Sequence, residues 1–186
     1  MPSDPRTDFL AAASWVNGLV RATKPDQLDL PTPDQGWTVR DLLGHIVKME
    51  SVVPMVIAPD EAPLALEPTD ATWAEVYEAG LDHIRTIFAE PDLLDRPTTT
   101  FFGPMPAGEF IARFISEFLV HGWDLAVSTG LNPEGPTDIA ERTFQMSQAL
   151  TPAEGRNPQA FAAPVEPPAT AGPTTKLAAW LGHQVP

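Results

Sequence analysis

The sequence predicts an all-α protein whose helices form a bundle around one core. Apolar residues recur every three or four positions over several long segments, which is the spacing of amphipathic helices rather than of strands. The 22 prolines gather between these segments, so they mark where helices begin and end. The chain offers no set of alternating strands, and a helical bundle is the architecture that buries apolar stripes of this kind.

The first helix is expected to run from about Pro5 to just before Lys24. Pro5 follows Asp4 and suits the first turn of a helix, where its missing amide hydrogen is not needed. Phe9 and Val16 belong to an apolar series with helical spacing. This segment is therefore predicted to bury one face.

The second helix has the clearest start in the sequence. Thr38 can cap it and Asp41 follows three residues later, which is the pattern of a capping box. Pro54 is expected to kink or stop the helix near Val53, because proline lacks an amide hydrogen and crowds the preceding turn. A loop around residues 59–68 then leads to the third helix.

The third helix repeats the capping device with Thr72 and Glu75 and is expected to end ahead of Pro91. Residues 98–102 have strand propensity, but a run of glycine and prolines beginning at Gly103 closes them off. They are therefore predicted to form a short extended connection at most.

The fourth helix is expected to start near Pro106 and to end at Gly130, which can take the left-handed conformation that terminates helices. A fifth helix is predicted from about Thr137 to Leu150. Residues 151–173 are rich in proline and alanine and are expected to lie over the body as irregular chain. The segment from Thr174 to Leu181 can add one or two helical turns.

The 186 residues suffice for a single domain over 1–186, in which 151–186 form a Pro/Ala-rich C-terminal extension. No apolar run approaches the roughly 18 residues of a membrane helix. The first residues resemble neither a secretory signal nor a transit peptide, so a cytoplasmic location is expected.

The net charge and the cysteine content limit the kinds of molecule that this protein is expected to bind. The formal net charge of -14 would repel nucleic acid and anionic membranes, which excludes both as expected partners. The chain has no cysteine, and so it can form no disulfide and carries no thiol nucleophile of its own. Any thiol chemistry needs an external thiol.

Two histidines and a glutamate form a candidate metal site. Glu117 and His121 stand four positions apart on the fourth helix, so both side chains leave the same face. His45 lies on the amphipathic second helix, and together the three would supply the ligands of a half-open catalytic zinc site. The alternatives are hydrogen-bonded core histidines and, for Glu117, an ordinary salt bridge with Arg113.

Other polar residues are interpreted either as groups that orient the candidate ligands or as surface residues. Asp124 lies three positions past His121 and can accept its second N–H. Asp41 can reach His45, although helix capping is favoured for it. His83 and His183 are expected at the surface.

Two motifs carry a family resemblance. Residues 36–47, Gly-Trp-Thr-Val-Arg-Asp-Leu-Leu-Gly-His-Ile-Val, and residues 121–126, His-Gly-Trp-Asp-Leu-Ala, resemble the DinB-like superfamily, and within it the mycothiol-dependent maleylpyruvate isomerase branch. The tail, residues 161–168 and 177–182, is similar to the ends of short, single-domain members. The resemblance thus covers essentially the whole chain.

This resemblance implies an up-down-down-up four-helix bundle, here with an extra C-terminal helix and a proline-rich tail. It also implies a divalent metal, zinc first and nickel or iron as alternatives, with ligand positions that match His45, Glu117 and His121. Relatives use the metal to activate mycothiol or a similar thiol. The isomerase proper has a further C-terminal domain, which this chain ends too early to contain, and relatives often carry cysteine where this chain has Asp34.

The leading hypothesis is a metal-dependent enzyme that activates a mycothiol-like thiol for transfer to an electrophilic substrate or for isomerisation. A noncatalytic metal-binding or small-ligand-binding module is the alternative from another class. A third option is an Fe(II) site that reacts with oxygen, since two histidines and a carboxylate suit that chemistry as well. The oligomeric state stays open, with a homodimer among the options.

Overall fold

Helices dominate the structure, a computed structural model that describes residues 4–60, 64, 67–156 and 161–185. In chain order the elements are α1 (Pro5–Ala22), η1 (Pro25–Gln27), α2 (Val39–Ile57), α3 (Trp73–Phe88), η2 (Leu93–Asp95), β1 (Pro97–Thr100), β2 (Gly103–Pro106), α4 (Ala107–Thr129), α5 (Thr137–Leu150) and α6 (Pro173–Leu181). The predicted all-α class is confirmed, with one small hairpin added.

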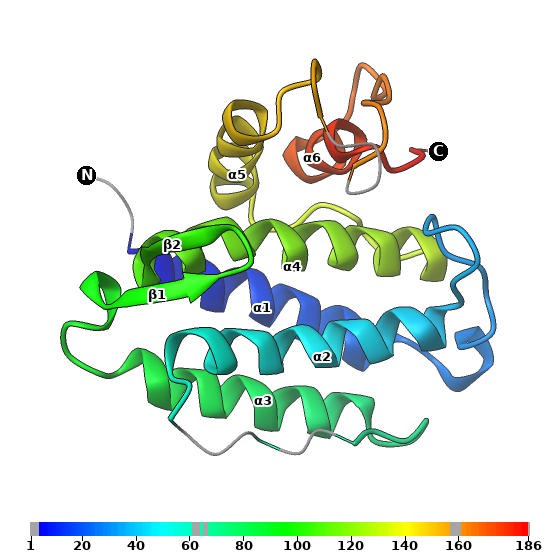
Figure 1. Cartoon of the computed structure of the whole chain (residues 1–186). Helices are drawn as coiled ribbons and strands as arrows, with labels where there is room; N and C mark the ends of the chain where they lie inside the picture. The colour runs from blue at the N-terminus through cyan, green and yellow to red at the C-terminus, as the bar shows by residue number, and fades with distance from the viewer. Residues whose placement is uncertain (1–3, 61–63, 65–66, 157–160, 186) are drawn as a thin grey trace.

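The long helices α1 to α4 form an up-down-down-up bundle, as the family resemblance implies (Figure 1). α1 and α4 run in one direction, and α2 and α3 run together in the other, while α5 and α6 lie over α4 on the side away from α3. Aromatic rings fill the centre: Phe9 of α1 contacts Phe88 of α3 and Phe118 of α4 edge-on, with ring centroids 5.3 and 4.8 Å apart. The apolar stripes seen in the sequence therefore face one another.

Side-chain caps are present at the starts of α1 and α2 and absent at the start of α3. The Asp4 side chain accepts a hydrogen bond from the Arg6 amide at the start of α1. Thr38 and Asp41 form the predicted capping box of α2. The capping box predicted for α3 is wrong: the Thr72 hydroxyl instead accepts from the Thr69 amide at 2.8 Å, a local turn that competes with the cap.

Pro54 does not stop α2 near Val53, which was one of the two outcomes expected from the sequence, the other being a kink. The helix continues to Ile57, and the Ala58 amide donates to the Pro54 carbonyl at 2.8 Å. Proline removes only its own hydrogen bond, and the buried side chains of Val53 and Ile57 hold the last turn in the core.

Residues 97–106 form an antiparallel hairpin rather than the single extended connection that was predicted. Thr98 pairs with Met105 and Thr100 with Gly103. Gly103 has a φ of 101°, a conformation that glycine adopts without strain, and it closes the turn around Phe101 and Phe102. The glycine that was taken as a strand breaker is therefore what allows the chain to reverse.

The C-terminal extension is fixed to the bundle through α6. α4 ends at Gly130 as predicted, with a φ of 73°. The Glu134 carboxylate accepts hydrogen bonds from the amides of Thr174 and Thr175 at the start of α6, and Trp123 of α4 donates to the Thr175 hydroxyl at 2.9 Å. The end of the chain is thereby held close to the C-terminal half of α4. No helix among the described residues is both long and apolar enough to cross a membrane.

Gly122 sets the close approach of α4 to α1, which leads to a first prediction. A Cβ at this position would lie 2.9 Å from Val16 Cγ2 and still closer to the Trp15 ring. Gly122→Ala is therefore expected to lower the free energy of unfolding by roughly 1–3 kcal/mol in a denaturant titration, because rigid packed atoms must move. Gly18→Ala is the matched control: its Cβ meets nothing within 4 Å, so it is expected to be neutral or mildly stabilising.

Candidate metal centre

The structure brings the three predicted ligands together between α2 and α4. The donor atoms of His45, Glu117 and His121 all lie within 4.8 Å of one another. His121 Nε2 is 3.6 Å from Glu117 Oε2, and the ring centroids of His45 and His121 are 4.6 Å apart. Donors around a tetrahedral zinc ion stand roughly 3.3–3.5 Å apart, so small side-chain adjustments suffice for all three to share one ion.

His45, Glu117 and His121 are called the cluster from here on. The carboxylate of Asp124 contacts one imidazole of the cluster, that of His121, and also the imidazole of His183. Asp124 is fully buried, and its Oδ2 is 3.3 Å from His121 Nδ1, so the predicted orienting contact is present. Its other oxygen lies 2.8 Å from Nδ1 of His183. The expectation that His183 is a surface residue is wrong, because the docking of α6 carries the chain end to the cluster. His83 is part-buried on α3 and is not a member of the cluster. Asp41 serves as the helix cap, as favoured.

Asp34 is a further acidic group at the site that reasoning from residue patterns missed. Its Oδ2 lies 3.9 Å from His121 Nδ1, and with His121 and Asp124 it forms a second set of potential metal ligands. That oxygen is buried without a hydrogen-bond partner among the described residues. Only the family resemblance pointed to this position, because relatives often carry cysteine there.

The electrostatics of the cluster favour a cation. Burial opposes protonation of His121, but hydrogen bonds to Asp124 and Glu117 outweigh it and raise the pKa of His121 to about 10. Burial, together with the neighbouring His121, lowers the pKa of His45. Burial and the charge of Asp124 raise the pKa of Asp34. A positive charge at His121 is thus what balances the carboxylates, and a divalent cation fits the same place with the two-nitrogen, one-oxygen donor set.

A cavity of about 600 Å³ opens beside Glu117 and His121. Its wall comes from α4, α5, α6, the hairpin tip and parts of the loops, and includes His183 and Asp34. A small molecule in this cavity would touch Glu117 and His121 directly.

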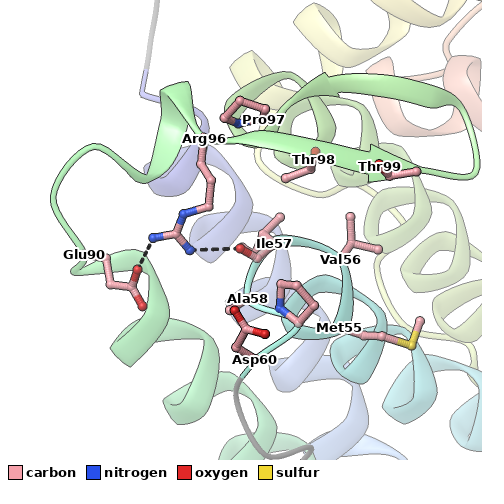
Figure 2. Close-up of a pocket in the computed structure, with 11 residues that line it drawn as sticks. Met55, Val56, Ile57, Ala58, Asp60, Glu90, Arg96, Pro97, Thr98 and Thr99 are labelled. Atoms are coloured by element: carbon pink, nitrogen blue, oxygen red, sulfur yellow. Dashed lines mark hydrogen bonds and ion pairs between the residues drawn. The ribbon is translucent and has the colours of Figure 1, made fainter.

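A second cavity, of about 610 Å³, lies between the end of α2 and β1 (Figure 2). Its one arginine, Arg96, donates to the Ile57 carbonyl at 3.0 Å and pairs with Glu90. The described lining of this cavity includes no histidine. Both sets of potential metal ligands found among the described residues include His121, which lines the first cavity.

The fold and the cluster together define a helical bundle of the DinB-like kind, with potential metal ligands between its second and fourth helices. The sequence profile of the mycothiol maleylpyruvate isomerase N-terminal domain matches residues 9–126. The chain belongs to this family, which confirms the resemblance drawn from the motifs around His45 and His121.

The chain is also similar to two curated proteins along nearly its whole length and to two solved structures in fold. Two curated relatives, Uncharacterized protein MT0763 and Uncharacterized protein Rv0738 from two strains of Mycobacterium tuberculosis, are each 30% identical over 184 residues, covering 98% of this chain and 99% of the relative. The crystal structure of the mycothiol-dependent maleylpyruvate isomerase matches with a TM-score of 0.62, and that of a histidine-to-alanine mutant with 0.60. Each of these two structures is 15% identical in sequence to this chain, and the match covers 84% of this chain and 74% of the other. This similarity shows that the fold is shared.

Proposed function

We propose that the chain is a metal-dependent enzyme that activates a low-molecular-weight thiol, such as mycothiol, for transfer or isomerisation. The convergence of His45, Glu117 and His121 beside an open cavity carries this proposal. The family adds support, since its named member is a mycothiol-dependent isomerase. The absence of cysteine fits it as well, because the nucleophilic sulfur then comes from outside.

His45, Glu117 and His121 would hold the cation, with zinc first and nickel or iron as alternatives. When bound, a divalent cation supplies Lewis acidity, which lowers the pKa of a thiol near it. Asp124 keeps Nδ1 of His121 occupied, which leaves Nε2 directed at Glu117 and the shared site. In a transfer, the sulfur forms a bond to the electrophilic carbon, the thiol proton goes to solvent, and the leaving group departs with its bonding electrons.

A conjugation assay tests the proposed activity. Zinc- or nickel-loaded protein is expected to accelerate the reaction of mycothiol with 1-chloro-2,4-dinitrobenzene at least tenfold over background, followed by release of chloride and absorbance of the product. Chelator-treated protein is expected to return to background, and readdition of the ion to restore the rate. Background rates from metal-loaded protein with mycothiol and with other low-molecular-weight thiols would argue for a noncatalytic binding module.

Asp124→Asn should weaken metal binding roughly tenfold to hundredfold, because the amide no longer offers two negative oxygens to orient His121 and His183. Competition with a chromophoric chelator measures the affinity, and circular dichroism checks that the variant is folded. Asp138→Asn changes an exposed carboxylate on α5 and serves as the control. Equal affinity in the two variants would remove Asp124 from the supporting role.

A further inference from the structure

The cavity beside Glu117 and His121 has a mainly apolar wall. Its apolar part comes from seven side chains in separate parts of the chain: Phe101, Phe102, Val120, Met146, Leu150, Phe161 and Leu181. Burial of apolar surface is favourable by roughly 25 cal/mol per Å², so such a wall favours an apolar ligand.

The hairpin tip places two aromatic side chains at this cavity. Phe101 is 64% exposed and Phe102 46%, and their ring centroids lie 4.3 Å apart. Phe101 also contacts Phe110 and Phe114 of α4, at 5.8 and 6.4 Å, so the tip is held against the helix that carries Glu117. Two adjacent exposed aromatic rings next to a cavity are the pattern of a surface that a ligand covers.

The charges at the cavity disfavour an anionic ligand. Asp34 and Glu117 both line it, and so do His121 and His183, whose imidazoles pair with Glu117 and Asp124. Among its described lining residues Arg113 is the only lysine or arginine, and its guanidinium pairs with Glu109 and lies over the Phe102 ring at 5.9 Å. A carboxylate ligand would therefore approach acidic groups and find the guanidinium and both imidazoles already paired with carboxylates.

His45 borders a second groove, whose described lining shares no residue with the first cavity. That groove is lined by Trp37, Arg40, Asp41 and Lys48, and the Lys48 side chain is exposed. Its polar and charged lining suits a hydrophilic thiol better than the apolar cavity does. Members of the cluster thus line two cavities of different chemistry.

We infer that the cavity walled by Phe101, Phe102 and Met146 binds the electrophile, and that this electrophile is an uncharged, apolar molecule carrying an aromatic ring rather than a dicarboxylic acid. The inference rests on the proposed function. In the reaction, the external sulfur bonds to a carbon of this molecule, the leaving group takes the electron pair of the broken bond, and the thiol proton is released. Phe101 and Phe102 are the specificity-determining residues, because they contact the ring of the substrate.

Two unreactive probes of the same shape test this inference. 2-(Methylsulfonyl)naphthalene and naphthalene-2-sulfonate share a ring system and differ in one negative charge, and neither needs the thiol or turnover. Titration of zinc-loaded protein, followed by ligand NMR, is expected to show at least tenfold tighter binding of the neutral sulfone. Phe101→Ala and Phe102→Ala are each expected to weaken sulfone binding about threefold to tenfold. Met55→Ala, which removes an exposed apolar side chain at the other cavity (Figure 2), is expected to leave binding unchanged.

Equal or tighter binding of the sulfonate would overturn the inference, as would absence of binding by both probes or indifference of sulfone binding to the two phenylalanine substitutions. The result is separable from the proposed function. Selective sulfone binding without any thiol transfer would refute the enzyme and keep the apolar site. Transfer of thiol to a dicarboxylate without sulfone binding would support the enzyme and refute the apolar site.

Discussion

Replacing Glu50 with glutamine is expected to stabilise the protein at neutral pH by roughly 3–4 kcal/mol. Glu50 lies on α2 and is 1% exposed, and neither of its carboxylate oxygens has a hydrogen-bond partner among the described residues. Gly80 of α3 leaves room for it, since a Cβ there would come within 2.5 Å of Glu50 Oε2. Burial, together with the charge of Glu78, raises the pKa of Glu50 from 4.5 to about 10.

The sign of the effect follows from proton binding. Below pH 4.5 the carboxyl is protonated in both the folded and the unfolded chain, so stability is unaffected. As the pH rises toward 10, the unfolded chain loses this proton while the folded chain retains it, and stability falls by about 1.4 kcal/mol per pH unit. Glutamine does not titrate, so the advantage of Glu50→Gln should vanish near pH 4 and grow toward pH 8.

Urea unfolding of both proteins at pH 4, 6 and 8 measures this difference. Glu75→Gln, an exposed position on α3, is the control and is expected to change stability by less than about 0.5 kcal/mol. A pH-independent difference between the wild type and Glu50→Gln would show that Glu50 is ionised in the folded protein.

The second large effect is expected from the metal ligands. Zinc at about one hundred times its dissociation constant should add about 2.7 kcal/mol to the stability of the wild type, which corresponds to a rise in Tm of roughly 5–10 °C. Glu117→Gln removes the one carboxylate of the donor set, so most of this rise should disappear. Differential scanning calorimetry with and without zinc measures both values.

Glu109→Gln provides the matched control for this experiment. It lies on the same helix, is half-exposed, and pairs with Arg113 instead of joining the cluster. The zinc-dependent rise in Tm should therefore persist in Glu109→Gln. A rise of equal size in Glu117→Gln would place the zinc elsewhere on this acidic protein.

Local interactions explain why much of the fold was predictable. The Thr38–Asp41 capping box and the left-handed Gly130 depend on a few neighbouring residues, and the structure confirms both. The continuation of α2 past Pro54 and the hairpin at Gly103 were not predicted, because they do not depend on local interactions. In each case tertiary packing decided the outcome: the core holds the last turn of α2, and the Phe101 ring packs on α4.

The residues of the candidate site also fall into two groups: those placed by helical spacing, which the sequence predicts, and those placed by tertiary packing, which it does not. Glu117, His121 and Asp124 lie within two helical turns, so their common location followed from spacing, and His45 was placed by the apolar face of its own helix. His183 is 59 positions from Asp124, and its contact depends on how Glu134 and Trp123 anchor α6. Asp34 belongs to the irregular chain before α2, where no periodicity fixes a direction. Neither contact has a sequence pattern that would reveal it.

Elemental analysis of the untagged protein, purified beside its His45→Ala and Glu117→Ala variants, tests the central claim most directly. The account predicts about one divalent ion per wild-type chain, with zinc, nickel or iron identified by mass, and strong depletion in both variants. Wild-type protein without a bound transition metal, or variants that retain it undiminished, would contradict a shared ion at His45, Glu117 and His121.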